Sequence, residues 1–239
     1  GGFLYPLEEK GMPFIFMNAA SSHKDMVTMV HEGGHAIHAF LMRSLDNVGF
    51  RQPPSEVCEL ASMSMELISM EHWHVFFEKE KDLKRARRQQ LEGVISCLPW
   101  IATIDDFQHW VYTHPGHSIA DRTEAWNKIY SRFSGTIVSR LEQQKVFNIL
   151  WQKQGHLFQN PFYYIEYGMA QLGAIAIWKN YRENPPKTLQ NFFSALRLGY
   201  TRSIPEIYKA AGIRFDFSLE TVRSLMQYAR QEWIALSNA

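Results

Sequence analysis

Apolar positions recur three or four residues apart along most of the chain. Between residues 23 and 45, and again from residue 55 to about residue 70, this spacing marks one face of a helix. Later stretches with helical spacing or long apolar runs predict further helices over 78–113, 123–133, 140–152, 161–181, 188–198, 205–211 and 218–236. The chain is therefore expected to fold mainly as α-helices.

Strand patterns are confined to the N-terminal end of the chain. The first dozen residues are rich in glycine and proline and predict a loop. Pro13 to Asn18 follows as a short apolar run rich in β-forming residues, which predicts a strand. At most one small β-sheet is expected, near the start of a single domain that spans residues 1–239.

Composition narrows the choice of partners. Of the 239 residues, 46% are hydrophobic and 21% are charged, which is ordinary for a globular protein. The formal net charge of +1 favours neither nucleic acid nor a membrane surface as a partner.

The expected cellular compartment follows from the two cysteines and from the absence of a recognisable signal peptide or membrane-spanning run. No signal peptide is recognisable and no apolar run approaches the ~20 residues that span a bilayer. Cys58 and Cys97 are expected to be buried thiols. A soluble, cytoplasmic protein is therefore predicted, although a chain that begins Gly-Gly is open to being a piece of something longer.

Residues 31 to 35 carry the strongest chemical signal in the sequence. His31-Glu32-Gly33-Gly34-His35 matches the pattern H-E-x-x-H. Because residues four apart lie on one helix face, the two imidazoles can hold a single metal ion, and zinc suits them well. Glu32 lies beside the first ligand and can act as a general base. Each glycine costs roughly 1 kcal/mol relative to alanine within a helix, which indicates that something approaches the backbone closely.

A third metal ligand is expected on the next helix, because catalytic zinc sites usually have three protein ligands and one open position. The candidates are Glu56, Glu59 and Glu66. Glu59 lies 24 residues after His35 (59 − 35) and suits an antiparallel helix that returns to the ion. Glu56 is typical of an acid that favours a helix start. Glu66 is interpreted as a residue that orients a ligand histidine.

The remaining histidines are interpreted as structural. His38 and Leu41 occupy the places where the metzincin pattern requires a glycine and a third histidine, so that class is excluded. His38 is expected to be packed or to support a ligand. Turn and packing roles are expected for His72, His74, His109, His114 and His117.

A second group of residues combines a histidine with three tyrosines: His156, Tyr163, Tyr164 and Tyr167. A phenol O–H can donate to a developing oxyanion without carrying charge. Tyr163 and Tyr167 are four residues apart, so a helix that begins near Pro161 points them the same way. On the residues alone, such a cluster is more typical of a core than of an active site.

Three segments together resemble the oligoendopeptidase F branch of the M3 metallopeptidases. They are FIFMN at 14–18, HEGGHA at 31–36 and CELASMSMEL at 58–67. The resemblance implies a zincin-type helical catalytic domain with one zinc ion, and it implies that Glu59 joins His31 and His35 as the third ligand.

The second group is similar to the histidine-then-tyrosines motif of the same family. Matching the family's Tyr-Ile-x-Tyr to residues 164–167 makes Tyr167 the implied oxyanion donor. His156 and Tyr164 would then contact the substrate or the intermediate, and Tyr163 is the alternative if the register differs.

The resemblance implies a zinc endopeptidase that acts on oligopeptides. The substrate backbone is expected to pair with the strand that holds Phe16 and ends at Asn18. The chain corresponds only to the family's C-terminal, catalytic part. The N-terminal wall of the substrate channel is therefore expected to be missing or to be supplied by another chain, for example a second copy through self-association. A more open cleft would then admit longer unfolded chains. The alternative is a fragment that binds zinc or peptide without catalysis.

Overall fold

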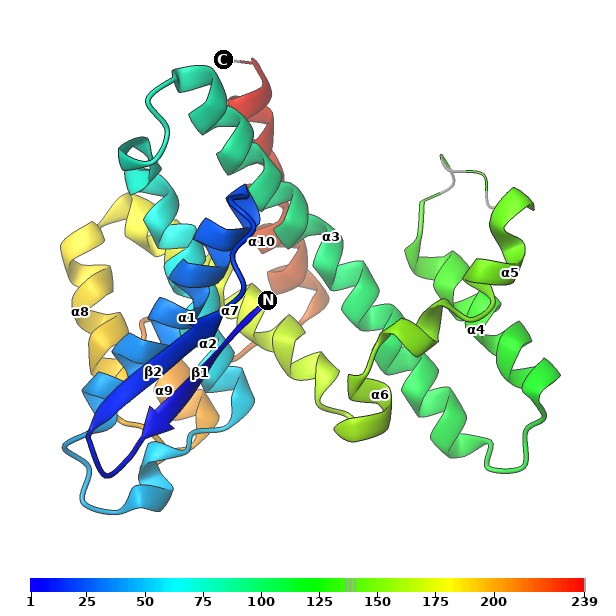
Figure 1. The fold of residues 1–239 in the computed structure, drawn as a ribbon, viewed down its shortest axis with the longest axis horizontal. Coiled ribbons are helices and arrows are strands. Elements are labelled where there is room, and N and C mark those ends of the chain that lie inside the picture. The colour runs from blue at the N-terminus through cyan, green and yellow to red at the C-terminus, as the bar shows by residue number, and fades with distance from the viewer. Residues whose placement is uncertain (136, 138, 140, 239) are drawn as a thin grey trace. The chain divides into compact units, whose positions relative to one another are not determined.

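The computed structural model describes residues 1–135, 137, 139 and 141–238. The chain forms two compact units, one made of Gly1–Gly93 with the residues from Met169 onward, and the other made of Val94–Gly168. Helices α3 (Glu80–Thr113) and α7 (Tyr164–Glu183) each supply residues to both units (Figure 1). The expected mainly α fold is confirmed. The single catalytic domain over 1–239 stays a prediction.

The first unit begins with a β-hairpin and continues as helices. Its elements are β1 (Gly2–Leu7), β2 (Met12–Met17), α1 (His23–Met42), α2 (Ser55–Ser69), the first part of α3, most of α7, α8 (Pro185–Leu196), α9 (Ile204–Ala210) and α10 (Leu219–Asn238), with short 3₁₀ helices at Val48–Arg51 and Met70–Val75. The helices predicted over 188–198, 205–211 and 218–236 are therefore confirmed with shifted ends.

The loop predicted for the first dozen residues is wrong, because β1 pairs antiparallel with β2 from Gly2↔Met17 to Leu7↔Met12. Gly11 has φ +60°, which closes the turn between the strands. Proline is tolerated since each strand of a two-stranded sheet is an edge strand. The strand predicted over 13–18 is confirmed one residue earlier.

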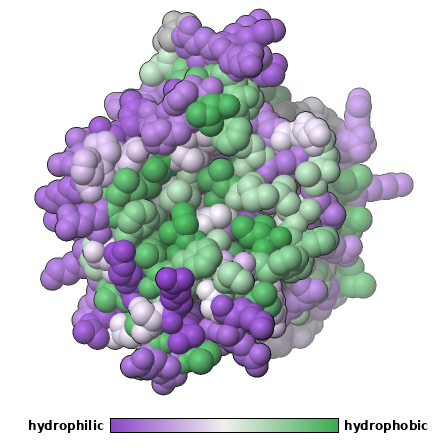
Figure 2. Space-filling view, turned by 60° about the vertical axis from the view of Figure 1, so that its left-hand side comes forward, coloured by the Kyte–Doolittle hydropathy of each residue, from purple (hydrophilic) through white to green (hydrophobic). Residues whose placement is uncertain are grey.

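One face of the hairpin packs toward α1 and the other is exposed to solvent. The exposed side chains are all large and apolar: Phe3, Tyr5, Leu7, Met12, Phe14 and Phe16. The space-filling view in Figure 2 shows a broad field of hydrophobic residues framed by hydrophilic ones. The protein therefore presents more apolar surface to solvent than scattered single residues would give.

The core of the first unit forms where α2, α7, α8 and α9 meet. Leu60, Ile177, Phe192 and Tyr208 are fully buried there. Gly173 on α7 permits this packing, because a Cβ at that position would lie 2.7 Å from the side chain of Leu60 and 2.9 Å from that of Tyr208. This core fixes α2, which carries all three glutamates considered as the third metal ligand.

The second unit contains the end of α3, α4 (Ile119–Phe133), short helices α5 (Gln144–Phe147) and α6 (His156–Gln159), 3₁₀ helices at Leu141–Gln143 and Leu150–Lys153, and the start of α7. Ile104, Phe107, Trp126 and Ile129 form its core. The single helix predicted over 140–152 is wrong, because short helical turns follow one another there; residue 140 itself lies outside the described residues.

Two predicted features of α3 and α4 are informative. The helix predicted over 78–113 is confirmed as α3, and it continues through Pro99. The helix predicted from residue 123 begins earlier, at Ile119, because the Ser118 side chain accepts from the Asp121 N–H and caps it. None of the described helices is long and apolar enough to cross a membrane.

Candidate metal centre

Helix α1 brings the H-E-x-x-H residues together. Its start is fixed by Asp25, whose carboxylate accepts the backbone N–H of Ser22 at 2.7 Å. The helix then runs without a break through both glycines to Met42. His31 and His35 consequently lie one turn apart, with ring centroids 4.9 Å apart and planes at 86°.

The glycine at position 34 explains how α2 reaches this face of α1. A Cβ on Gly34 would lie 2.6 Å from Cα of Ser62 and 2.9 Å from the carbonyl oxygen of Ala61. Only a hydrogen atom fits between the two backbones. A Cβ on Gly33 would meet nothing within 4 Å. The close backbone approach expected from the glycine pair is therefore confirmed at Gly34, and it does not account for Gly33.

The crossing of the two helices places Glu59 against both histidines. Oε2 of Glu59 lies 3.4 Å from Nε2 of His31 and 3.8 Å from Nε2 of His35. One ligand atom from each of the three residues lies within 4.8 Å of the others, and the three form the only group of this kind in the described part of the chain. Two imidazole nitrogens and one carboxylate oxygen are a typical ligand set for zinc. The residues therefore fit a metal ion.

Two of the three candidate ligands, His31 and Glu59, are held by further hydrogen bonds. Glu66 Oε1 lies 2.6 Å from Nδ1 of His31, which leaves Nε2 to face Glu59. The hydroxyl of Ser62 donates to Oε2 of Glu59 at 3.0 Å. The amide of Gln90, on α3, donates to Oε2 of Glu66 at 2.6 Å. The sequence pattern pointed to Glu66 but missed Ser62 and Gln90, since serine and glutamine carry no spacing signal of their own.

Burial and neighbouring charges set the protonation states of the candidate ligands. Burial, and then the neighbouring His31 and His38, lower the pKa of His35 to about 3, so its ring is neutral near pH 7. Burial also lowers the pKa of His31, but the hydrogen bond and charge of Glu66 and the charges of nearby carboxylates outweigh it, and the pKa is raised overall. The pKa of Glu59 is raised, chiefly by burial. A cation among these groups would relieve the cost of burying the carboxylate.

Glu32 lies on α1 between the two histidines and is 6% exposed. Burial raises the pKa of its carboxyl group, and the neighbouring His31 partly offsets this rise. A carboxylate whose pKa is raised is a better proton acceptor near neutral pH. Glu32 therefore has the environment expected of a general base.

The other candidates on these helices have structural contacts. His38 is 2% exposed and its pKa is lowered to about 4, mainly by burial, while a hydrogen bond to the Leu196 backbone acts in the opposite direction. Glu56 lies in the first turn of α2, and its backbone carbonyl accepts from the hydroxyl of Tyr208 at 3.2 Å. The packed role expected for His38 is confirmed.

The second group of predicted residues forms one aromatic cluster in the other unit. The His156 ring is stacked on Tyr163 at 5.6 Å, and it lies 5.1 Å from the ring of Tyr164 and 5.7 Å from that of Tyr167. Burial lowers the pKa of His156 and raises that of Tyr164, so both side chains favour their neutral forms. The rings of Tyr163 and Tyr167 also lie 5.3 Å apart, as their spacing indicated, and the role of the cluster in catalysis stays a prediction.

The turn before α7 helps to position the tyrosines. Phe162 has φ +61°, a left-handed conformation that costs roughly 1–2 kcal/mol for a residue with a side chain. Its ring packs on His109 and Tyr112, each at 5.0 Å, and its N–H donates to Gln108 Oε1 at 2.9 Å. These contacts hold the strained residue directly before Tyr163.

The two strand residues predicted to meet substrate lie at the end of β2. Phe16 is 48% exposed and its ring lies 5.5 Å from that of Phe3. Asn18 follows the strand, and its N–H donates to the carbonyl of Gly1 at 3.1 Å. Both are open to solvent, and their role in binding stays a prediction.

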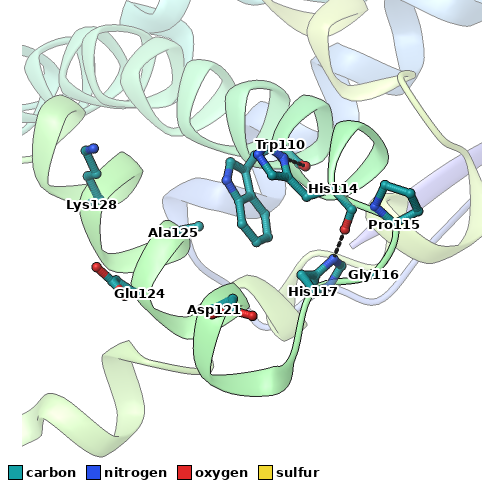
Figure 3. A pocket seen from close by; sticks show the side chains of 9 residues that line it. All are labelled: Trp110, His114, Pro115, Gly116, His117, Asp121, Glu124, Ala125 and Lys128. Carbon is teal, nitrogen blue, oxygen red and sulfur yellow. Dashed lines mark hydrogen bonds between the residues drawn. The ribbon is translucent and has the colours of Figure 1, made fainter.

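A pocket of about 550 Å³ in the second unit contains the histidines on either side of Pro115 (Figure 3). The ring of His114 stacks on Trp110 at 4.6 Å. Both nitrogens of His117 are engaged, one with the carbonyl oxygen of His114 and the other with Nε of Arg122 at 2.8 Å. These bonds confirm the interpretation of the two histidines as turn residues.

Two histidines from one helical turn and a glutamate from a neighbouring helix define a helical protein with a candidate H-E-x-x-H metal centre. The chain belongs to peptidase family M3, whose family model matches residues 5–227. The resemblance seen in the sequence is thereby confirmed.

Individual relatives agree with this assignment. The chain is 21% identical over 207 residues to oligopeptidase PepF of Bacillus subtilis (strain 168), and 24% identical over 204 residues to an oligoendopeptidase F homolog of Borreliella burgdorferi. These matches cover 84% and 79% of this chain but 30% and 32% of the relatives. Among solved structures, Pz peptidase A with inhibitor 2 is 28% identical, with a TM-score of 0.89 over 98% of this chain and 42% of that one. The chain therefore spans about a third of the curated relatives it matches.

Proposed function

We propose that this chain is a zinc-dependent endopeptidase that hydrolyses peptide bonds in oligopeptides. The observation that carries the proposal is the convergence of His31, His35 and Glu59, with ligand atoms within 4.8 Å of one another. The M3 family and its oligopeptidase relatives support the peptide substrate. The same relatives are about three times as long as this chain, so the activity of a whole M3 protein is itself part of the proposal.

His31, His35 and Glu59 would hold the zinc ion. A bound zinc ion supplies Lewis acidity, which polarises water and the scissile carbonyl. Glu66 and Ser62 would orient His31 and Glu59 as ligands through their hydrogen bonds. Glu32 removes a proton from the attacking water and delivers it to the leaving amine, a role that its raised pKa supports.

The aromatic cluster is proposed to serve the same reaction. Tyr167 donates its phenol proton in a hydrogen bond to the developing oxyanion. His156 and Tyr164 contact the substrate or the intermediate, and Tyr163 replaces one of the tyrosines if the family register differs. The family motif supports these roles, together with the mutual packing of the four rings.

Substrate is proposed to bind along β2. Because β1 covers one edge of β2 only, the opposite edge has backbone groups available to an extended peptide. Phe16 and Asn18 lie along this path. Longer unfolded chains are proposed as a second substrate class. Zinc rather than another divalent metal and a cytoplasmic location stay predictions from the sequence.

The test is cleavage of an internally quenched peptide by zinc-loaded wild-type protein and by Glu32→Gln. The variant should bind zinc as the wild type does and lose about 10²–10⁴-fold in turnover, because only the proton acceptor is removed. Glu56→Gln, on α2, is the matched control and should keep its activity. Undiminished turnover in Glu32→Gln would refute the assignment of the base.

A binding fragment without catalysis is the second candidate, and the chain's coverage of 30% to 42% of its relatives favours it. The same assay separates the two functions. A fragment of this kind would bind zinc and peptide but would not cleave the peptide. Adding a chelator would therefore leave the fluorescence signal unchanged.

A further inference from the structure

Gln90 is a buried polar residue on α3, among the buried apolar residues Ala86, Leu91 and Val94 of the same helix. Its neighbours Arg88 and Gln89 are exposed, whereas Gln90 is only 8% exposed. Burying an amide costs free energy unless it is hydrogen-bonded. Here the amide nitrogen donates to Oε2 of Glu66 at 2.6 Å, and this bond accounts for the burial.

The bond from Gln90 is the outer link of a chain that ends at the metal centre. Glu66 uses its second oxygen, Oε1, for Nδ1 of His31 at 2.6 Å. The chain of hydrogen bonds therefore crosses three helices, from Gln90 on α3 through Glu66 on α2 to His31 on α1. Both bonds are short, as is typical when one partner is a carboxylate.

The geometry of a carboxylate explains why the outer link matters. A carboxylate bonded only at Oε1 can still swing about its Cγ–Cδ bond and carry the imidazole with it. A donor fixed on Oε2 removes that freedom and holds the ring so that Nε2 faces Glu59. A glutamine is suited to this task, because a neutral donor does not compete with the histidine for the carboxylate's charge, as a lysine or arginine would.

We propose that Gln90 is a positioning residue of the metal centre, which acts through Glu66 to orient His31. This inference rests on the proposed function, since it requires that His31 binds metal. It differs from a purely structural role for Gln90, in which the amide would only satisfy a buried carboxylate and would not affect metal binding.

The experiment measures zinc affinity by competition with a chromophoric chelator at fixed pH. Gln90→Met keeps the length of the side chain and removes the donor. Gln89→Met makes the same change one residue away on the exposed side of α3 and serves as the matched control. Zinc affinity should fall about tenfold in Gln90→Met, the low end of the range for residues that orient a metal ligand through hydrogen bonds, and should be unchanged in Gln89→Met.

A double-mutant cycle tests the route through Glu66. In a Glu66→Gln background, where the carboxylate is already absent, adding Gln90→Met should change zinc affinity less than twofold. Gln90→Asn is the second variant, because it stays polar but is one methylene too short to reach Glu66, and it should weaken zinc binding as well. Melting curves of the metal-free variants establish that each is folded.

The outcomes separate this inference from the proposed function. If the wild type and Gln89→Met bind zinc and Gln90→Met and Gln90→Asn bind it equally well, the inference is overturned. It is also overturned if the effects of the Glu66 and Gln90 changes simply add. If no protein binds zinc, the proposed function fails instead.

Discussion

The close contact at Gly34 makes the effect of one methyl group on the site predictable. In Gly34→Ala the new Cβ would lie 2.6 Å from Cα of Ser62, which is 0.8 Å inside the 3.4 Å at which ordinary contact begins. The carbonyl oxygen of Ala61, at 2.9 Å, closes the same space. Because both are backbone atoms, neither can turn aside, and α2 has to move away from α1.

The size of the effect follows from two opposing contributions. Overpacking costs about 1–3 kcal/mol, and rigid backbone neighbours place this case at about 3 kcal/mol. Alanine regains about 1 kcal/mol of helix propensity over glycine. The expected loss in the free energy of unfolding is therefore about 2 kcal/mol, or about 4–8 °C in Tm for a chain of this size. The displacement also moves Glu59 away from both histidines, so zinc affinity should fall.

The assay compares Gly34→Ala with Gly33→Ala, which makes the same change at the adjacent position. Gly33 faces open space, so its variant should be more stable by up to about 1 kcal/mol. Thermal unfolding of the metal-free proteins and zinc competition give the two readouts. Gly34→Ala with unchanged stability and unchanged zinc affinity would refute the argument that this glycine sets the distance between the helices.

Three further predictions concern single side chains. Ser62→Ala should lower zinc affinity about tenfold, because Glu59 loses the hydrogen bond that holds it. Ser64→Ala is the control, since it removes a buried hydroxyl with no hydrogen-bond partner, and it should leave zinc affinity unchanged. Equal zinc affinities of the two variants would contradict the role of Ser62. The folded-state pKa of His38, about 4, is below its unfolded value, so stability is present above pH 6.5 and falls by about 3 kcal/mol as pH drops to 4. Urea titrations between pH 6.5 and 4 should show a smaller fall in the free energy of unfolding for His38→Gln than for the wild type. An equal fall in the two proteins would exclude His38 as the source of this pH dependence. Tyr167→Phe should bind zinc normally and lose about 10²-fold in turnover on the quenched peptide, with a smaller loss in Tyr163→Phe; the reverse order would shift the oxyanion role to Tyr163.

Much of the fold could be read from periodic patterns. The four-residue spacing of His31 and His35 requires a helix, and α1 supplies it. The connection after α1 brings Glu59 back to the histidines, as its distance along the chain indicated. Gly34 was informative because glycine in mid-helix is unfavourable without a packing reason.

Other features depend on contacts that no local pattern contains. Strand β1 was missed because its pairing with β2, rather than its own composition, makes it a strand. Pro99 does not end α3, although local propensity disfavours proline within a helix. Ser62 and Gln90 gain their roles only from the partners that tertiary packing brings within hydrogen-bond distance.

X-ray absorption at the zinc edge of the zinc-loaded protein tests the central claim most directly. The account predicts one zinc per chain, with two imidazole nitrogens at about 2.0–2.1 Å and a carboxylate oxygen at about 2.0–2.2 Å. Glu59→Ala should remove the carboxylate from this shell and leave both imidazoles. A zinc shell with fewer than two imidazoles, or one that Glu59→Ala leaves unchanged, would contradict the account.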